Sequence, residues 1–143
     1  MRSDRVNKLA ANARRGTALV EMALALIILL LLAMGAIEYG WLFLKQQQIT
    51  NAARQAARLA STADATTADV DSQITTLMNS YGLGSTGYAK NYSWDGELKS
   101  IARGTTVSVQ ISVAYSKVTI TNSSLLPMPA TVSATVAMQK EGP

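Results

Sequence analysis

The sequence contains no cysteine and no histidine among its 143 residues, and only three prolines. These absences exclude disulfides, thiolate and imidazole metal sites, cysteine nucleophiles and every histidine-based catalytic triad. Serine, lysine and acidic residues are present, but nothing in the sequence gathers them. The pairs Asp69/Asp71 and Asp95/Glu97 are spaced like acids in the first turn of a helix and at a hairpin tip. We therefore expect no enzyme, no metal site and no cofactor.

Net charge is confined to one end of the chain. Residues 1–16 hold five basic side chains and one acidic side chain, which together supply the whole net charge of +4. From Thr17 onward the basic and acidic side chains balance at eight each. The bulk of the protein therefore lacks the basic surface that a nucleic-acid partner requires.

A long apolar run follows the basic segment. Residues 17–44 are interrupted by charge only at Glu21 and Glu38, and as a helix they would extend roughly 42 Å, enough to cross a hydrocarbon core. The run is apolar on all sides, which is typical of a helix surrounded by lipid or by other apolar helices. Arg14 and Arg15 before it predict a cytoplasmic N-terminus by the positive-inside rule.

The far end of the run has the residues of a membrane interface. Tyr39 and Trp41, followed by Lys45, form an expected interfacial belt, and we interpret Glu38 beside them as a hydrated interfacial carboxylate in preference to a subunit contact. Beyond Lys45 the sequence is rich in helix formers, so the helix is predicted to continue to about Ser61. Its small side chains gather on one side and allow close packing against a neighbour: Ala52, Ala53, Ala56, Ala57 and Ala60.

The remainder predicts a small α+β unit. Thr67 is expected to cap a short helix that carries Val70, Ile74, Leu77 and Met78 at helical spacing and ends at Gly82. Residues 88–94 and 97–102 flank a predicted hairpin turn at Asp95-Gly96, and two alternating segments follow, 105–115 and 130–138. The expected fold is a long N-terminal helix, a short helix and an antiparallel sheet of three or four strands.

The segment "GLGSTG", residues 82–87, matches the dinucleotide-binding pattern of glycines. That pattern binds a pyrophosphate only between a strand and the start of a helix. Here it follows a predicted helix and precedes a predicted strand, so we interpret it as a plain loop.

The most informative segment is "RRGTALVE", residues 14–21. Cleavage after Gly16 would give Thr17 a new α-amino group, with Glu21 one helical turn away on the same face. The carboxylate could then balance that ammonium group, or the one of an adjacent subunit. An unpaired charge in lipid costs on the order of 3 kcal/mol, so pairing would favour association of helices in one register.

A basic leader, a glycine, four residues and a glutamate at the head of an apolar helix resemble the processing site of type IV prepilins. The resemblance extends to the TadE-like family of the tight-adherence (Flp) pilus system. That family's motifs correspond here to Gly16 and Glu21, to the segment Ile37-Glu38-Tyr39-Gly40, and to residues 50–58. The segment "VSATVAMQKE" near the C-terminus resembles the family's closing strand more loosely.

The resemblance implies a minor pilin or pseudopilin of a type IVb pilus that takes part in pilus biogenesis, adhesion and surface colonisation. It implies processing between Gly16 and Thr17 by a prepilin peptidase, and partners among other pilin subunits and, indirectly, the assembly platform and its ATPase. We expect a cleaved basic leader (1–16), a transmembrane and assembly helix (17–61) and a small extracytoplasmic α+β domain (62–143). The location would be the bacterial inner membrane, with a single pass and a periplasmic C-terminal domain, and after assembly the pilus.

Two other classes of protein remain open. An exported soluble protein could use an ordinary signal peptide cut near Ala33-Met34-Gly35, although this gives Glu21 no purpose within the apolar run. A single-span membrane enzyme or receptor is the other alternative, but no site for either activity is visible in the sequence.

Overall fold

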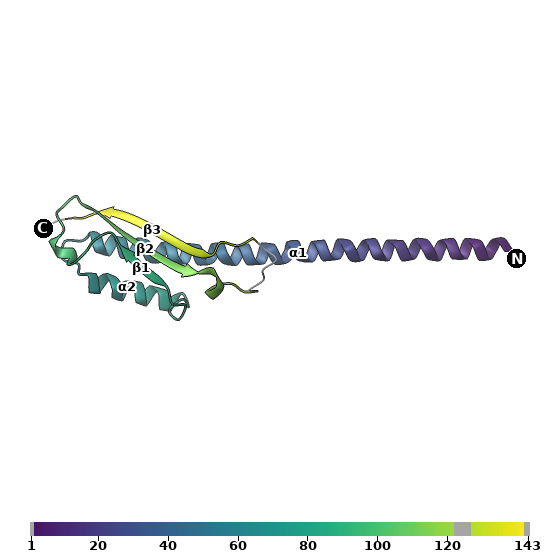
Figure 1. Cartoon of the computed structure of the whole chain (residues 1–143), viewed down its shortest axis with the longest axis horizontal. Helices are drawn as coiled ribbons and strands as arrows, with labels where there is room; N and C mark the ends of the chain where they lie inside the picture. Colours follow the sequence, from purple (N-terminus) through teal and green to yellow (C-terminus); the bar gives the residue numbers. More distant parts are fainter. Residues whose placement is uncertain (1, 122–126, 142–143) are drawn as a thin grey trace. The chain divides into compact units, whose positions relative to one another are not determined.

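The computed structural model describes the backbone of residues 2–121 and 127–141, and the side chains of residues 16–121 and 127–141. The described chain has two α-helices, three β-strands and two short 3-10 turns (Figure 1). A long apolar helix, a second short helix and an antiparallel sheet confirm the α+β fold predicted from the sequence. The five residues 122–126 lie outside the described part.

Helix α1 (Arg2–Ser61) is one continuous element and ends at the residue predicted from the sequence. Within Gly16–Ser61 it holds a stretch long and apolar enough to cross a membrane, and almost none of that stretch is buried inside the protein. Large side chains such as Leu24, Leu29 and Leu32 are more than half exposed. Exposed apolar surface of this length suggests a membrane anchor.

The chain forms two compact units, Met1–Ile37 and Glu38–Pro143. The first is the N-terminal part of α1 alone. The second contains the C-terminal part of α1 together with all the other elements. The contacts place residues 38–61, the C-terminal part of the predicted transmembrane and assembly helix (17–61), inside the second unit.

The reason is a buried stripe along this part of α1. Glu38, Lys45 and Ile49 are buried, and so are five alanines at helical spacing: Ala52, Ala53, Ala56, Ala57 and Ala60. The close packing that these small side chains allow is therefore made with the same chain. Because alanine projects only a methyl group, the sheet and the second helix can approach the α1 backbone closely. Arg54 and Arg58 lie on the opposite, exposed side.

Helix α2 (Thr67–Ser80) buries Val70, Ile74 and Met78, as the spacing predicts. Its N-cap is Thr66, one residue before the Thr67 we expected, because the Thr66 hydroxyl accepts from the Asp69 amide while the Asp69 carboxylate accepts from the Thr66 amide. This reciprocal capping box satisfies two amides that the helix itself cannot.

The helix ends at Ser80, and Gly82, the glycine predicted to terminate it, follows the C-cap residue Tyr81 with a φ of 69°. The amide of Leu83 reaches back to the Met78 carbonyl at 2.8 Å, and the Gly82 amide to the Asn79 carbonyl at 3.0 Å. This pairing is a Schellman motif, and its left-handed residue favours glycine.

The sheet has the order β1-β2-β3 and is antiparallel throughout. Its strands are β1 (Ala89–Tyr92), β2 (Thr106–Ala114) and β3 (Thr131–Gln139). The alternation predicted for β2 is confirmed, since Val107, Val109, Ile111 and Val113 are all buried. On β3 the same face buries Val132 and Ala134, which pair with Val113 and Ile111. This inner face joins α1 and α2 in one hydrophobic core.

A polar cluster connects β1 to α2. The Asp71 carboxylate on α2 accepts hydrogen bonds from the Lys90 ammonium and the Tyr92 hydroxyl on β1. Burial alone would raise the pKa of Asp71, but these two donors outweigh it and hold the pKa below its ordinary value. The Tyr92 ring also stacks on Trp94, with 4.6 Å between ring centroids. The cluster fixes the short edge strand against α2.

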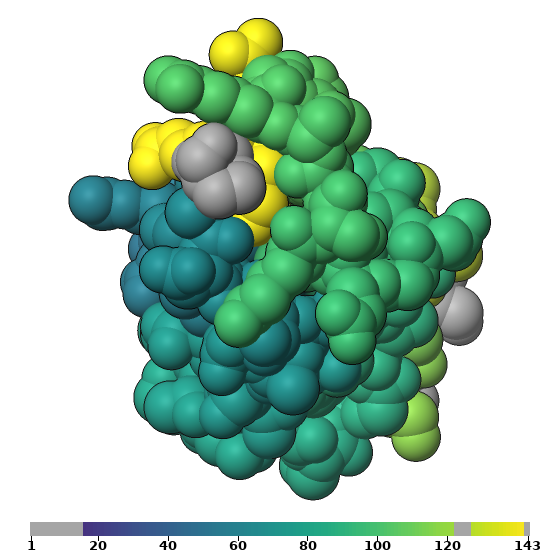
Figure 2. All heavy atoms as spheres, turned by 90° about the vertical axis from the view of Figure 1, so that its left-hand side faces the viewer, coloured from purple at the N-terminus to yellow at the C-terminus, as the bar shows by residue number. Residues whose placement is uncertain are grey.

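The end of α1 is closed by the C-terminal residues of the chain. The Lys140 ammonium donates to the carbonyls of Ala60 and Thr62, and the Glu141 amide donates to Ser61 at 2.7 Å. Burial lowers the pKa of Lys140. These contacts satisfy carbonyls that the last turn of α1 leaves without a helical partner. Figure 2 views this end of the unit, where the green segment that follows β1 lies across the blue and teal atoms of the helices.

One predicted strand is wrong. The segment 97–102 does not pair across the Asp95-Gly96 turn; it forms the 3-10 turn η1 (Leu98–Ser100) and buries Leu98 in the core. Strand β1 instead pairs with β2, seventeen to twenty-three residues further along the chain. Gly96 does adopt a positive φ of 85°, so the turn exists without the hairpin. Tyr115, expected at the end of β2, lies in the 3-10 turn η2 (Tyr115–Lys117).

The alanine stripe of α1 makes a direct prediction for stability. Ala56→Leu should destabilise the second unit by about 1–3 kcal/mol, because a larger side chain at this fully buried position must push the sheet or α2 away. Arg54→Leu, on the exposed side of the same helix, should change stability by less than about 0.5 kcal/mol. Denaturation of the full chain in detergent, followed by tryptophan fluorescence, measures both. Equal effects of the two substitutions would contradict the packing described here.

Candidate functional site

The residues of the predicted processing site lie together on one face of α1. Gly16, Thr17 and Glu21 line a common open hollow with Val20 and Leu24. This spacing of one, four, five and eight residues is that of a single helix face. All five residues are exposed. The structure therefore brings the predicted cleavage position and the predicted charge-pairing carboxylate onto the same surface.

Packing within the described part of the chain does not require glycine at position 16. A Cβ built at this position meets no atom within 4 Å, and the helix runs through it without a break. In a helix interior glycine is less favourable than alanine by about 0.5–1 kcal/mol. The helix would therefore be more stable with another residue here, so any need for glycine must come from a molecule that acts on the chain.

The surroundings of Glu21 are apolar. Its neighbours Leu19, Val20 and Met22 are 62–69% exposed, and the apolar run continues for another four turns of the helix. A carboxylate in such a position has few polar groups to stabilise its charge once the helix is in lipid. A cation brought to within one helical turn, such as an α-amino group on Thr17, would offset that cost.

Glu38 is the main correction to the sequence interpretation. We expected a hydrated carboxylate, but its side chain is only 1% exposed. It accepts hydrogen bonds from the hydroxyls of Tyr115 and Thr119, from the amide of Ile120 at 3.2 Å, and from both the amide and the hydroxyl of Thr121 at 3.2 and 3.0 Å. All these donors are neutral. The charge is therefore stabilised by dipoles of the same chain and not by water.

The neighbouring aromatic residues also contact the segment that follows β2. The Tyr39 hydroxyl donates to the Pro127 carbonyl at 2.8 Å, and the Trp41 indole donates to the Val118 carbonyl at 2.7 Å. The Lys45 ammonium lies 4.7 Å from the centre of the Trp41 ring and donates to the Tyr81 carbonyl at 3.2 Å. Tyr39 and Trp41 thus fix loop backbone to α1. Their position at a membrane interface remains a prediction.

Sequence reasoning missed one functional feature, which is that Glu38 accepts five hydrogen bonds. The donors lie 77 to 83 residues away along the chain. No local spacing connects them to Glu38, although the cluster of hydroxyl residues in "YSKVTITN" was a visible signal. We use the name base clasp for the contacts that Glu38, Tyr39 and Trp41 make with residues 115–121 and Pro127.

The glycine-rich loop and the acidic side chains are two other candidates for a binding site. The 82–87 loop follows α2 and precedes β1, which confirms that it lacks the strand-to-helix context of a dinucleotide site. Its Gly84 packs directly on Asn79, whose side chain would overlap any Cβ placed there. Among the residues whose side chains are described, no group of three or more acidic residues, histidines or cysteines could hold a metal ion.

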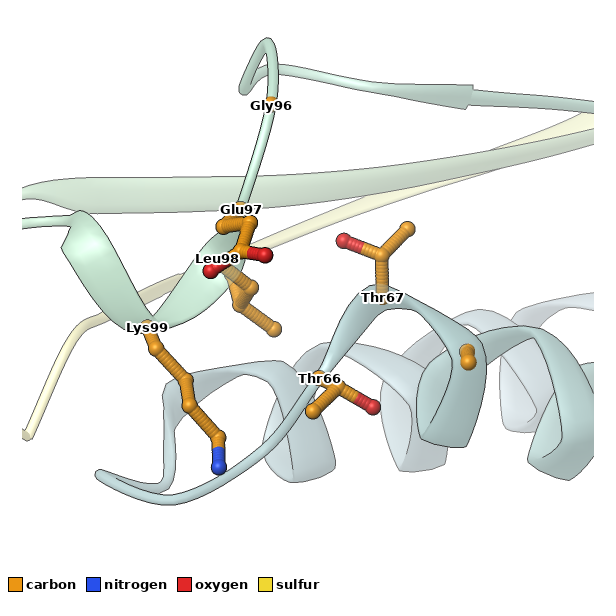
Figure 3. A pocket seen from close by; sticks show the side chains of 7 residues that line it. Thr66, Thr67, Gly96, Glu97, Leu98 and Lys99 are labelled. Carbon is orange, nitrogen blue, oxygen red and sulfur yellow. The ribbon is translucent and has the colours of Figure 1, made fainter.

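The start of α2 borders a cavity of about 390 Å³. Thr66 and Thr67 face Glu97 and Leu98 across it, with Lys99 beside them (Figure 3). The capping box already satisfies the Thr66 and Asp69 amides that would otherwise bind an anion at this helix end. The cavity therefore reflects how η1 covers α2, and no ligand role is assigned to it.

Removal of the Glu38 carboxylate tests the base clasp. Glu38→Ala would leave three hydroxyls and two amides without their acceptor, so we expect a loss of roughly 3 kcal/mol or more in stability. Hydrogen exchange of the Ile120 and Thr121 amides should accelerate strongly. Glu21→Ala, a loss of the other acid in the apolar run of residues 17–44, should leave exchange at both amides unchanged. Unaltered protection in Glu38→Ala would show that the clasp does not hold this segment.

Comparison with known proteins bears on the helix alone. No curated protein and no solved structure matches the chain. The model of one family, described as TadE-like protein, matches residues 16–58. The match begins at Gly16, includes Glu21 and Glu38, and ends at Arg58 within α1. This family is a structural one associated with the tight-adherence pilus. Over residues 16–58 the chain matches the TadE-like family, as its resemblance to that family led us to expect.

Proposed function

We propose that this protein is a minor pilin or pseudopilin, a structural subunit of a tight-adherence type IVb pilus. The observation that carries the proposal is the shared face of Gly16, Thr17 and Glu21 at the start of an exposed apolar helix. The match of residues 16–58 to the TadE-like family supports it. Roles in pilus biogenesis, adhesion and surface colonisation follow from membership of such a filament.

The proposed processing step is hydrolysis of the Gly16–Thr17 peptide bond by a prepilin peptidase on the cytoplasmic side. The step removes the basic leader, residues 1–16. The rest of the chain then has equal numbers of basic and acidic side chains. A side chain at position 16 would meet no atom within 4 Å, so glycine is not needed there for packing. We therefore attribute the need for glycine to recognition by the peptidase. The product carries an α-amino group on Thr17, one turn from the Glu21 carboxylate.

The proposed assembly step uses that new charge. A carboxylate and an ammonium group that enter an apolar environment separately each cost on the order of 3 kcal/mol. When they pair, within one chain or between adjacent subunits, most of this cost is recovered. Pairing between subunits would also fix the axial register of neighbouring helices. The remaining apolar surface of residues 19–37 would then pack against lipid before assembly and against other pilins afterwards.

The proposed partners are the peptidase, other pilin or pseudopilin subunits and, indirectly, the assembly platform and its ATPase. The proposed location before assembly is the bacterial inner membrane, with the leader in the cytoplasm and the unit from Glu38 onward in the periplasm. The unit supplies a folded α+β body for contacts in the assembled pilus. The exposed acids and bases of that unit nearly balance, which fits a protein partner better than nucleic acid.

Processing is tested by the N-terminal sequence of the membrane-associated protein. We expect the wild-type chain to begin at Thr17, and Gly16→Leu to keep its leader because a branched side chain at the cleavage position obstructs the peptidase. Gly40→Leu is the matched control, since it is also a helical glycine whose Cβ would meet no atom within 4 Å, and it should be cleaved normally. A product that begins at Ala36 would identify a signal peptide, and an intact Met1 a plain membrane anchor. Either product contradicts the proposal.

Charge pairing is tested by replacing the carboxylate without changing its size. Glu21→Gln should still be cleaved but should enter pili on the order of a hundredfold less, as expected for a loss of about 3 kcal/mol. Met22→Ala, an exposed neighbour on another side of the helix, should be incorporated normally. Quantitative immunoblots of sheared pili against the membrane fraction give the ratio. Wild-type incorporation of the Gln variant would refute the pairing.

A further inference from the structure

The second unit exposes apolar side chains around the turn of α1 where it begins. Tyr39 is 46% exposed, Phe43 is 65% exposed, and Ile120, from the far part of the sequence, is 52% exposed. Ile120 is held beside this turn because its own amide donates to Glu38 at 3.2 Å. We call these three side chains the base surface. Ile120 lies between two threonines that both contact Glu38, and among the described residues it is not part of the hydrophobic core.

The position of the base surface along the chain relates it to the bilayer. Residues 17–37 rise about 30 Å as a helix, which equals the thickness of a hydrocarbon core. Tyr39 follows only two residues later, about 3 Å further along the same helix. If residues 17–37 span the membrane, the turn that contains Glu38 and Tyr39 must lie at the outer headgroups. Ile120, held by Glu38, must then lie at the same depth.

The base clasp has the chemistry that this depth demands. A carboxylate at the edge of the hydrocarbon core is expensive unless water or protein donors satisfy it. The segment Tyr115–Thr121 supplies three hydroxyls and two amides, and it leaves Glu38 almost fully buried. The same segment turns Ile120 outward and carries the exposed cation Lys117, which suits anionic headgroups. One short segment thus shields the acid from lipid and presents an apolar side chain and a positive charge.

We propose that the base surface rests on the outer leaflet of the membrane, with the Ile120 side chain inserted among the headgroups beside Tyr39 and Phe43. The partner is a lipid surface that includes anionic lipid. This inference rests on the membrane anchorage in the proposed function and adds a second contact with the bilayer, made by a segment far from the anchor in sequence. The contact would limit tilting of the second unit relative to the membrane before a subunit is extracted into a filament.

The absence of cysteine from the sequence makes the experiment direct, since any introduced cysteine is unique. Single variants of the full chain, Ile120→Cys, Lys99→Cys and Leu30→Cys, are labelled with an environment-sensitive fluorophore. Each is reconstituted at low protein density in vesicles of phosphatidylcholine and phosphatidylglycerol that contain brominated lipid as a quencher. Lys99 is exposed in η1, and Leu30 lies in the apolar run. Both serve as reference depths.

We expect the label at position 120 to be quenched by bromine placed near the headgroups, and the label at position 99 to be unaffected. Quenching at position 30 with none at position 120 would overturn the proposal and leave the membrane anchor intact. No quenching at position 30 would overturn the anchor itself, and the base contact with it. Shielding of position 120 that grows with protein density would identify a neighbouring copy as the occupant and would also overturn the proposal.

Discussion

Burial of the Glu38 charge is the constraint on which the rest of the second unit depends. A carboxylate that directly follows an apolar run and is only 1% exposed must find its donors within the protein. They come from seven consecutive residues, 115–121, which join the end of β2 to the approach to β3. The Tyr115 amide also donates to the Ala130 carbonyl, just before β3 begins. One side chain on α1 therefore ties the connection between two strands to the helix.

Polar contacts at both ends of residues 38–61 hold this part of α1, and a row of alanines lies between them. At the far end, the Lys140 ammonium and the Glu141 amide donate to carbonyls around the last turn, so the end of β3 is tied to Ser61. Near its start, β3 is tied to α1 by the Gln46 side-chain amide, which donates to the Ser133 carbonyl at 2.9 Å. The buried alanines belong to the same hydrophobic core as the inner face of the sheet, so this part of α1 packs through small side chains. The directional polar contacts set the position of the sheet along residues 38–61 of α1. Apolar side chains account for most of the buried surface between them.

Periodicity in the sequence predicts the elements well where burial is one-sided. The end of α1 near Ser61 follows from its run of helix-forming residues. The buried residues of α2 and the inner face of β2 follow from spacing, because each element repeats its burial every 3.6 or two residues. The partners of Glu38 do not follow, since they lie 77 or more residues away. The sequence predicts a strand over residues 97–102, yet Leu98 is buried by a 3-10 turn. A six-residue segment with only two strongly apolar positions, Leu98 and Ile101, carries too little periodicity to distinguish a strand from a turn.

Glu21 and Glu38, the two acids of the apolar run, differ in whether their own chain stabilises their charge. This difference decides which of them can pair with a cation on a neighbouring molecule. Glu38 has its donors in its own chain, so it has little to gain from a cation on a neighbour. Glu21 is exposed among leucine, valine and methionine side chains, so its charge remains costly in lipid until a cation approaches. The proposed cleavage after Gly16 would create such a cation one helical turn away and would leave the surroundings of Glu38 unchanged. A processing event can therefore alter the association of the first unit without disturbing the fold of the second.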